Sequence, residues 1–183
     1  MRHVKVPIFR FSELSEKARE RVKQLHMECF GYERADEALA SLKALTAYFG
    51  GKLADWSIDW FDGSYSSAKF DMNDGDNRED LSEEEIERRL AELGGDCPLT
   101  GYFFDDAVIA AFRAAWDAGE RDLGRIMQKV FRSWLKVAQE NCTFLYSDEV
   151  FGEGCMDSEF YVDGRLVDKA GVEYLDEEAP DAG

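Results

Sequence analysis

The chain has 183 residues, of which 45% are hydrophobic and 13% aromatic, and its net charge is −17. A chain of this length can bury roughly 70% of its unfolded surface around one core. It contains no run of about 18 apolar residues, which disfavours a membrane-spanning protein, and a surface so negative repels nucleic-acid backbones, which disfavours direct DNA or RNA binding.

The acidic residues are concentrated in two segments. Residues 71–92 carry 10 acidic and 3 basic side chains, and residues 148–183 carry 12 and 2. Residues 1–70 and 93–147 are nearly neutral. A basic protein groove that normally holds nucleic acid would therefore be attracted to these two segments.

The opening MRHVKVPIFRF lacks the apolar segment of a signal peptide, so we expect a cytoplasmic protein. The four cysteines have no paired spacing, and in a reducing compartment we expect them to be free thiols. They are Cys29, Cys97, Cys142 and Cys155.

The first third of the chain predicts one strand and two helices. Residues 3–11 alternate between apolar and basic side chains, with Pro7 indicating an edge or a bulge. Ser15 is a suitable N-cap for a helix that ends at Gly31. A second helix is expected over residues 33–49.

A β-hairpin follows. Residues 55–61 and 66–72 each alternate with period two, and an Asp-Gly-Ser turn separates them. Beyond an acidic loop, Ser82 and Glu85 fit a capping box that opens a third helix.

The second half predicts two more helices and a closing hairpin. A helix is expected over residues 105–119, and residues 123–141 form the most amphipathic stretch of the chain. Residues 158–162 are expected to form a closing strand that turns back to pair with residues 165–167.

We expect residues 123–141 to form the central core helix. At 100° per residue their apolar members share one broad face, which can be stabilised only by packing against other elements. This face comprises Leu123, Ile126, Met127, Val130, Phe131, Trp134, Val137 and Ala138. The opposite face carries Arg125, Lys129, Arg132 and Lys136. This basic row could bind a polyanion, but in a chain with 39 acidic residues a solvated, neutralised helix face is the simpler interpretation.

These elements predict an α+β fold, in which a small, mainly antiparallel sheet of three to five strands has about five helices packed on one face. Residues 1–175 are expected to form a single domain, and residues 176–183 a disordered acidic tail.

The sequence contains no Walker A loop, HExxH, GxSxG or CxxC motif. His26 and Cys29 could share a metal, but two ligands are too few for a zinc site, and we expect no metal or cofactor. The acidic run at residues 71–76 fails the EF-hand register, which favours a solvated loop. An enzyme pocket near Trp56 and Trp60, with Asp59 as a carboxylate, stays open as an alternative.

Four segments resemble a group of small phage and prophage proteins, some of which are described as antitoxin-like. They are FSELSEKARERV at 11–22, DWSIDWFDGSYSSAKF at 55–70, SDEVF at 147–151 and EFYVDGRLV at 159–167. The resemblance covers the first third and both ends, whereas residues 73–120 depart from it. It implies a phage origin and brings no active-site residue. Small acidic phage proteins without chemistry are similar in kind to inhibitors of host defence, including anti-CRISPR proteins that occupy the nucleic-acid groove of a Cas effector.

We therefore expect a binding protein that occludes the basic nucleic-acid-binding surface of a host nuclease, with carboxylates taking the place of phosphates. The first acidic patch comprises Asp71, Asp74, Asp76, Glu79, Asp80, Glu83, Glu84 and Glu87. The second acidic patch comprises Asp148, Glu149, Glu153, Asp157 and Glu159. The alternatives are simple solvation of these acids, an antitoxin that covers a basic toxin, a small enzyme, and a structural protein that forms a homodimer.

Overall fold

The structure is a computed structural model that describes residues 6–61, 64–72 and 81–167. The chain forms two compact units. Unit 1 contains residues 1–29 and 146–183, and unit 2 contains residues 30–145. The expectation of one domain over residues 1–175 stays a prediction, and the acidic tail at 176–183 lies outside the described residues.

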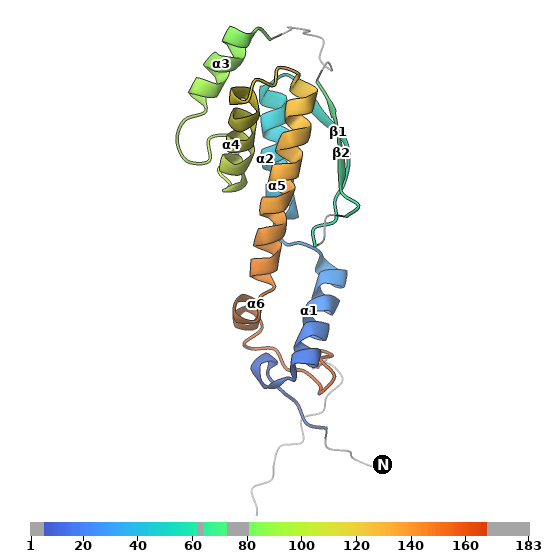
Figure 1. Cartoon of the computed structure of the whole chain (residues 1–183). Coiled ribbons are helices and arrows are strands. Elements are labelled where there is room, and N and C mark those ends of the chain that lie inside the picture. The colour runs from blue at the N-terminus through green and yellow to red at the C-terminus, as the bar shows by residue number, and fades with distance from the viewer. Residues whose placement is uncertain (1–5, 62–63, 73–80, 168–183) are drawn as a thin grey trace, which may run out of the picture. The chain divides into compact units, whose positions relative to one another are not determined.

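Unit 2 is built from helices and one β-hairpin (Figure 1). Helix α4 packs against α5 and α2, and the hairpin lies on the same helices, with strand β1 against α2 and β2 against α5. The bounds are α2 Ala35–Tyr48, β1 Lys52–Ser57, β2 Ser67–Asp71, α3 Glu83–Glu92, α4 Phe104–Asp117 and α5 Leu123–Leu145. The predicted α+β class with a small antiparallel sheet is confirmed. The expected number of strands is wrong for the described residues, which contain a two-stranded sheet.

Helix α5 is the core helix of unit 2, as its apolar periodicity predicts. Six members of the predicted face are buried, and a seventh buried residue, Cys142, extends the face by one turn. The indole Nε1 of Trp134 donates a 2.9 Å hydrogen bond to the carbonyl oxygen of Ala38, which fixes α5 against α2. Phe49 stacks on Phe112 with ring centroids 4.1 Å apart, which joins α2 to α4.

The hairpin is confirmed, but its first strand lies earlier in the chain than predicted. β1 spans Lys52–Ser57 and pairs antiparallel with β2. Beyond Ser57, side chains replace the ladder: the amide of Asp59 donates to Ser66 Oγ at 2.8 Å, and the Asp59 carboxylate accepts from the amide of Phe61 at 3.0 Å. Local hydrogen bonds of this kind compete with strand pairing. The strand therefore ends at Ser57, although the alternating pattern of the sequence continues to residue 61.

A buried carboxylate organises the segment before α4. The side chain of Asp105 is fully buried and accepts hydrogen bonds from the amides of Leu99, Thr100 and Gly101 at 2.9, 2.6 and 3.2 Å. The hydroxyl of Thr100 donates to it at 2.7 Å. Burial alone would raise the pKa of Asp105, but hydrogen bonds from Ser41, Thr100 and the backbone outweigh it and lower the pKa.

Unit 1 contains the turn η1 (Phe11–Glu13), most of helix α1 (Glu16–Phe30) and helix α6 (Asp148–Gly154). Ser15 Oγ accepts from the amide of Ala18 at the start of α1, so the predicted cap is confirmed. Aromatic and aliphatic side chains from all three elements form a small core. This core comprises Phe11, Leu14, Ala18, Val22, Phe151 and Phe160.

The strand predicted over residues 3–11 is wrong for the described part of that range. Only Phe9 pairs there, in an isolated bridge with Phe160. The amide of Arg10 donates to the Glu13 carboxylate at 2.8 Å, which starts the η1 turn and ends the extended conformation. Phe160 also bridges to Leu166 across the predicted turn, so the closing pairing is present as single bridges and not as strands.

Candidate functional site

The first acidic patch lies in unit 2. Asp71 ends β2 and is half buried, and its strand partner is Lys52. Glu83, Glu84 and Glu87 are exposed on α3. The remaining predicted members lie outside the described residues; they are Asp74, Asp76, Glu79 and Asp80.

Arginines of unit 2 neutralise part of α3. Oε2 of Glu83 lies 3.2 Å from Nε of Arg121. Glu85 binds Arg88 and Arg89, which lowers its pKa to about 2. Its carboxylate therefore does not complete the predicted capping box, although Ser82 does cap the helix by accepting from the amide of Glu85.

The second acidic patch lies in unit 1. Asp148, Glu149 and Glu153 are exposed on α6, which Ser147 caps by accepting from the amide of Val150. Asp157, also exposed, follows the helix. The last predicted member, Glu159, is half buried next to the Phe160 bridges.

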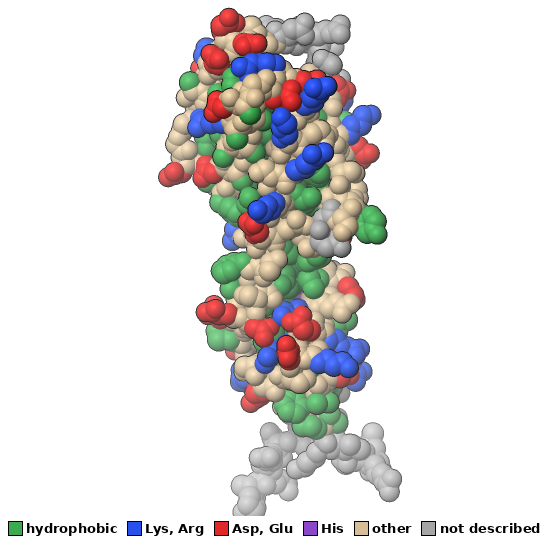
Figure 2. All heavy atoms as spheres, viewed as in Figure 1, with side chains coloured by type: hydrophobic (Ala, Val, Ile, Leu, Met, Phe, Trp, Pro, Cys, Tyr) green, Lys and Arg blue, Asp and Glu red, His purple; other side chains and the backbone are tan. Residues whose placement is uncertain are grey.

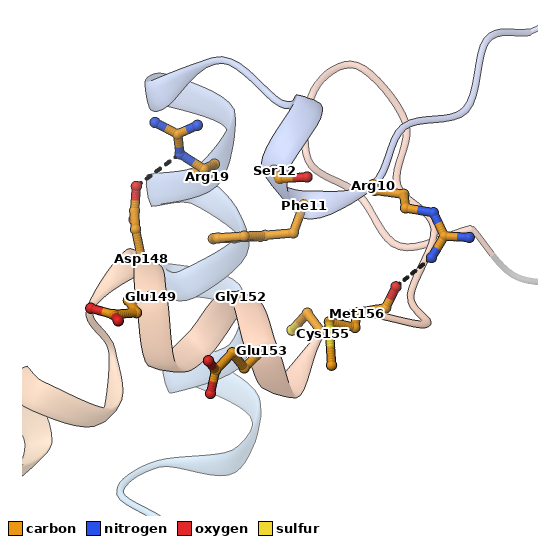
Figure 3. A pocket seen from close by; sticks show the side chains of 10 residues that line it. All are labelled: Arg10, Phe11, Ser12, Arg19, Asp148, Glu149, Gly152, Glu153, Cys155 and Met156. Carbon is orange, nitrogen blue, oxygen red and sulfur yellow. Dashed lines mark hydrogen bonds and ion pairs between the residues drawn. The ribbon is translucent and has the colours of Figure 1, made fainter.

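A groove of about 670 Å³ lies between η1, α1 and α6 in unit 1, beside the second acidic patch (Figure 3). Its volume falls within the range of small-ligand sites. Figure 3 shows the ring of Phe11 with Arg19 on one side and Arg10 on the other. The lining residues are Arg10, Phe11, Ser12, Arg19, Asp148, Glu149, Gly152, Glu153, Cys155 and Met156.

Asp148 links α6 to α1 through two cations. Lys23 Nζ lies 2.8 Å from Asp148 Oδ1 and also pairs with Glu20, and Arg19 Nε lies 2.9 Å from Asp148 Oδ2. The hydrogen bond from Lys23, together with the Arg19 charge, lowers the pKa of Asp148. Asp148 therefore holds the unit together, and its charge is less available to a partner than the sequence indicates.

Three other carboxylates of the second patch are exposed and have no described cation beside them. Glu149 and Glu153 lie one helical turn apart on α6 and both line the groove. Neither they nor Asp157 forms an ion pair with a Lys or Arg of the described residues. Glu84 and Glu87 of α3 are likewise unpaired with the Lys and Arg side chains that the structure describes. Within the two patches, five exposed carboxylates of the described residues therefore remain to attract a cation.

The basic row of α5 is exposed, and three of its four members pair with carboxylates, whereas Arg132 forms no ion pair with a described carboxylate. Figure 2 shows its Lys and Arg side chains with carboxylates beside them. The ion pairs are Arg125–Asp122, Lys129–Glu120 and Lys136–Glu140. This arrangement agrees with a solvated helix face and weakens the polyanion-binding alternative.

Of the aromatic residues considered for an enzyme pocket, Trp60 is packed among other rings and Trp56 is exposed. Trp60 packs between Tyr32 and Trp134, with ring centroids 5.0 and 5.7 Å away. Lys43 Nζ lies 4.4 Å above the ring of Trp56. His26 is likewise part of a packed cluster, with Nδ1 at 3.0 Å from the hydroxyl oxygen of Tyr146.

Within the described ranges, no group of three or more His, Cys, Asp or Glu side chains is arranged to hold a metal ion. No described helix is both long enough and apolar enough to cross a membrane.

Sequence reasoning found the carboxylates of the groove but missed its other wall. Arg10 and Phe11 fall within the predicted strand over residues 3–11, and Met156 lies in an irregular segment without a periodic pattern. A groove formed by segments as far as 146 residues apart leaves no local signal in the sequence.

No protein-family model, curated protein or solved structure matches the chain. No enzyme family or enzyme fold is therefore detected in it.

Proposed function

We propose that this chain is an acidic inhibitor that binds a basic nucleic-acid-binding surface of another protein and blocks it. The partner we propose is a host defence nuclease such as a Cas effector, with the inhibitor encoded by a phage. In this proposal the chain itself catalyses no reaction. One observation carries the proposal: five exposed carboxylates on or next to α3 and α6 are not neutralised by described Lys or Arg side chains.

Unpaired carboxylates on rigid helices suit this role for a physical reason. Exposed carboxylates lower the stability of the fold little because water solvates them. They attract the Lys and Arg side chains of a partner that otherwise bind phosphates. Exposed carboxylates without a described Lys or Arg partner also occur elsewhere, as at Asp36, Asp55 and Asp96, but these five are grouped on or next to two helices. Such contacts speed association and weaken as salt screens them.

The test is capture from a nuclease-treated bacterial lysate. The tagged chain is compared with E84Q/E87Q and with E149Q/E153Q/D157N. The double control variant D117N/E140Q removes two exposed charges elsewhere in unit 2. We expect the wild type to retain a nucleic-acid-binding protein at 50 mM salt and to lose most of it, about tenfold, at 500 mM. At least one patch variant should lose it at low salt, while the control should keep it.

Capture that is insensitive to salt, or that survives neutralisation of both patches together, would contradict the proposal. Recovery of a small basic toxin in place of a nucleic-acid-binding protein would replace the proposed partner with a toxin.

A further inference from the structure

The exposed aromatic side chains of unit 2 gather at one end of this unit. Among its described residues, seven large apolar side chains are exposed. Six of them lie just before α2 and α4, at the end of α5, and between the two hairpin strands, and Figure 1 shows these segments at the same end of the unit. We call these six residues the aromatic end; they are Phe30, Phe61, Tyr65, Tyr102, Phe103 and Phe144. The seventh, Trp56, lies within β1, where Lys43 covers its ring.

Tyr32 and Arg34 hold the segments of the aromatic end together. The ring centroid of Tyr32 lies 5.0 Å from that of Trp60 in the hairpin, and its hydroxyl donates a 2.7 Å hydrogen bond to Oδ1 of Asn141 in α5. The guanidinium carbon of Arg34 lies 5.8 Å from the ring centroid of Phe103, just before α4. The exposed rings therefore project from segments that already pack on one another, and the surface is preformed.

The aromatic end is large for a surface that faces only water. Its six side chains are between 38% and 83% exposed, which corresponds to roughly 500–800 Å² of aromatic surface. The largest apolar patch of a typical monomer is about 300–600 Å². Each partner in a standard protein interface contributes about 800 Å². The rings alone therefore supply most of the area that one partner of a stable dimer needs.

The charges next to the aromatic end balance each other. Arg34 pairs with Glu37 beside Phe103, and Lys136 pairs with Glu140, one turn before Phe144 on α5. Two copies of a chain with a net charge of −17 repel each other over most of their surface. At this end each copy presents apolar rings and neutral ion pairs, so two copies meet with little repulsion.

We propose that the aromatic end binds the aromatic end of a second copy of this chain. The same surface is used by both copies, as in a two-fold symmetric dimer, and the rings of one copy pack against those of the other. Helix α3 lies at the opposite end of α2, where Arg89 Nη1 donates to the carbonyl oxygen of Tyr48, and it stays outside this interface. The inference does not depend on the proposed function, because it uses none of the carboxylates of the two acidic patches.

The test is sedimentation equilibrium of the full chain between about 1 and 200 μM. We expect a species of twice the chain mass of 20.9 kDa. The variant Y65S/F144S removes two exposed rings and should raise the dimer Kd about tenfold or more. The control M156S/V162S removes two side chains of unit 1 that are equally exposed, at 64% and 68%, and should change it less than about twofold. Because the contact is apolar, raising the salt from about 50 to 500 mM should not weaken the dimer.

Several results would overturn the dimer. They are a wild type that stays monomeric at about 200 μM, a Y65S/F144S variant that dimerises as tightly as wild type, a control that weakens the dimer equally, and a dimer that dissociates as salt rises. If Y65S/F144S does not fold by circular dichroism, Phe144→Lys is the second test, because it places a charge in the interface and keeps a helix-compatible side chain at the end of α5. Wild-type affinity in that variant also counts against the proposal.

Discussion

Replacing Asp105 by alanine removes the carboxylate that holds the segment before α4 in unit 2. Three backbone amides and the Thr100 hydroxyl then lose their acceptor. Each buried donor left without a partner costs about 1–3 kcal/mol, and water reaches part of this half-exposed segment. We therefore expect Asp105→Ala to lower the free energy of unfolding by about 3–4 kcal/mol, or the melting temperature by about 10 °C.

Tryptophan fluorescence is the suitable assay, because all four tryptophans lie in unit 2. Asp106→Ala is the matched control. Asp106 is the exposed neighbour of Asp105, and its carboxylate has one long contact, 3.4 Å from the amide of Cys97. We expect a cost below about 0.5 kcal/mol for the control. Asp105→Ala melting within about 2 °C of Asp106→Ala would refute the reasoning.

The same carboxylate predicts a pH dependence. Because the folded pKa of Asp105 is below its ordinary value of 3.8, the ionised carboxylate stabilises the fold above that pH. This stability is lost as pH falls through the folded pKa. The difference in stability between wild type and Asp105→Ala should therefore be constant near neutral pH and shrink below about pH 4.

Three further predictions concern both units. Asp148→Ala should speed amide hydrogen exchange in α6 and cost about 1–2 kcal/mol, because it leaves the ammonium of Lys23, which is 7% exposed, without its main partner. Gly164→Ala places a Cβ 2.7 Å from a carbonyl oxygen of α1 at φ +85°, so thermal melting should show a larger loss than for Gly31→Ala, which costs about 1 kcal/mol in open space. Burial raises the pKa of the Cys142 thiol to about 11, so it should react with a disulfide reagent at pH 8 only after unfolding; rapid reaction in the native protein would contradict this.

The sequence predicts the parts of this fold in which one helix face is apolar over several turns. The α5 face is readable because Ile126, Val130 and Trp134 recur at helical spacing and are buried. Helix caps such as Ser82 and Ser147 are readable because their hydrogen bonds are local. The hairpin is also predicted correctly, because its alternating pattern and its turn residues are local features of the sequence.

The predicted strand over residues 3–11 and the predicted end of the first hairpin strand are wrong because side chains, and not neighbouring strands, bind backbone amides there. Glu13 binds the amide of Arg10, and Ser66 binds the amide of Asp59. The sequence also does not show which charged residues form ion pairs with each other. Asp148 and Glu149 look equivalent in the sequence, yet only Asp148 binds Lys23, from 125 residues away. The apolar wall of the groove is hidden for the same reason.

The most direct test of the central claim is competition between this chain and nucleic acid for the captured partner. The affinity of the partner for a labelled nucleic acid would be measured by fluorescence anisotropy at increasing concentrations of the chain. Occlusion predicts that the apparent Kd for nucleic acid rises in proportion to the added chain, and that E149Q/E153Q/D157N raises it less. A stable complex of partner, nucleic acid and chain, with the Kd for nucleic acid unchanged, would contradict the account.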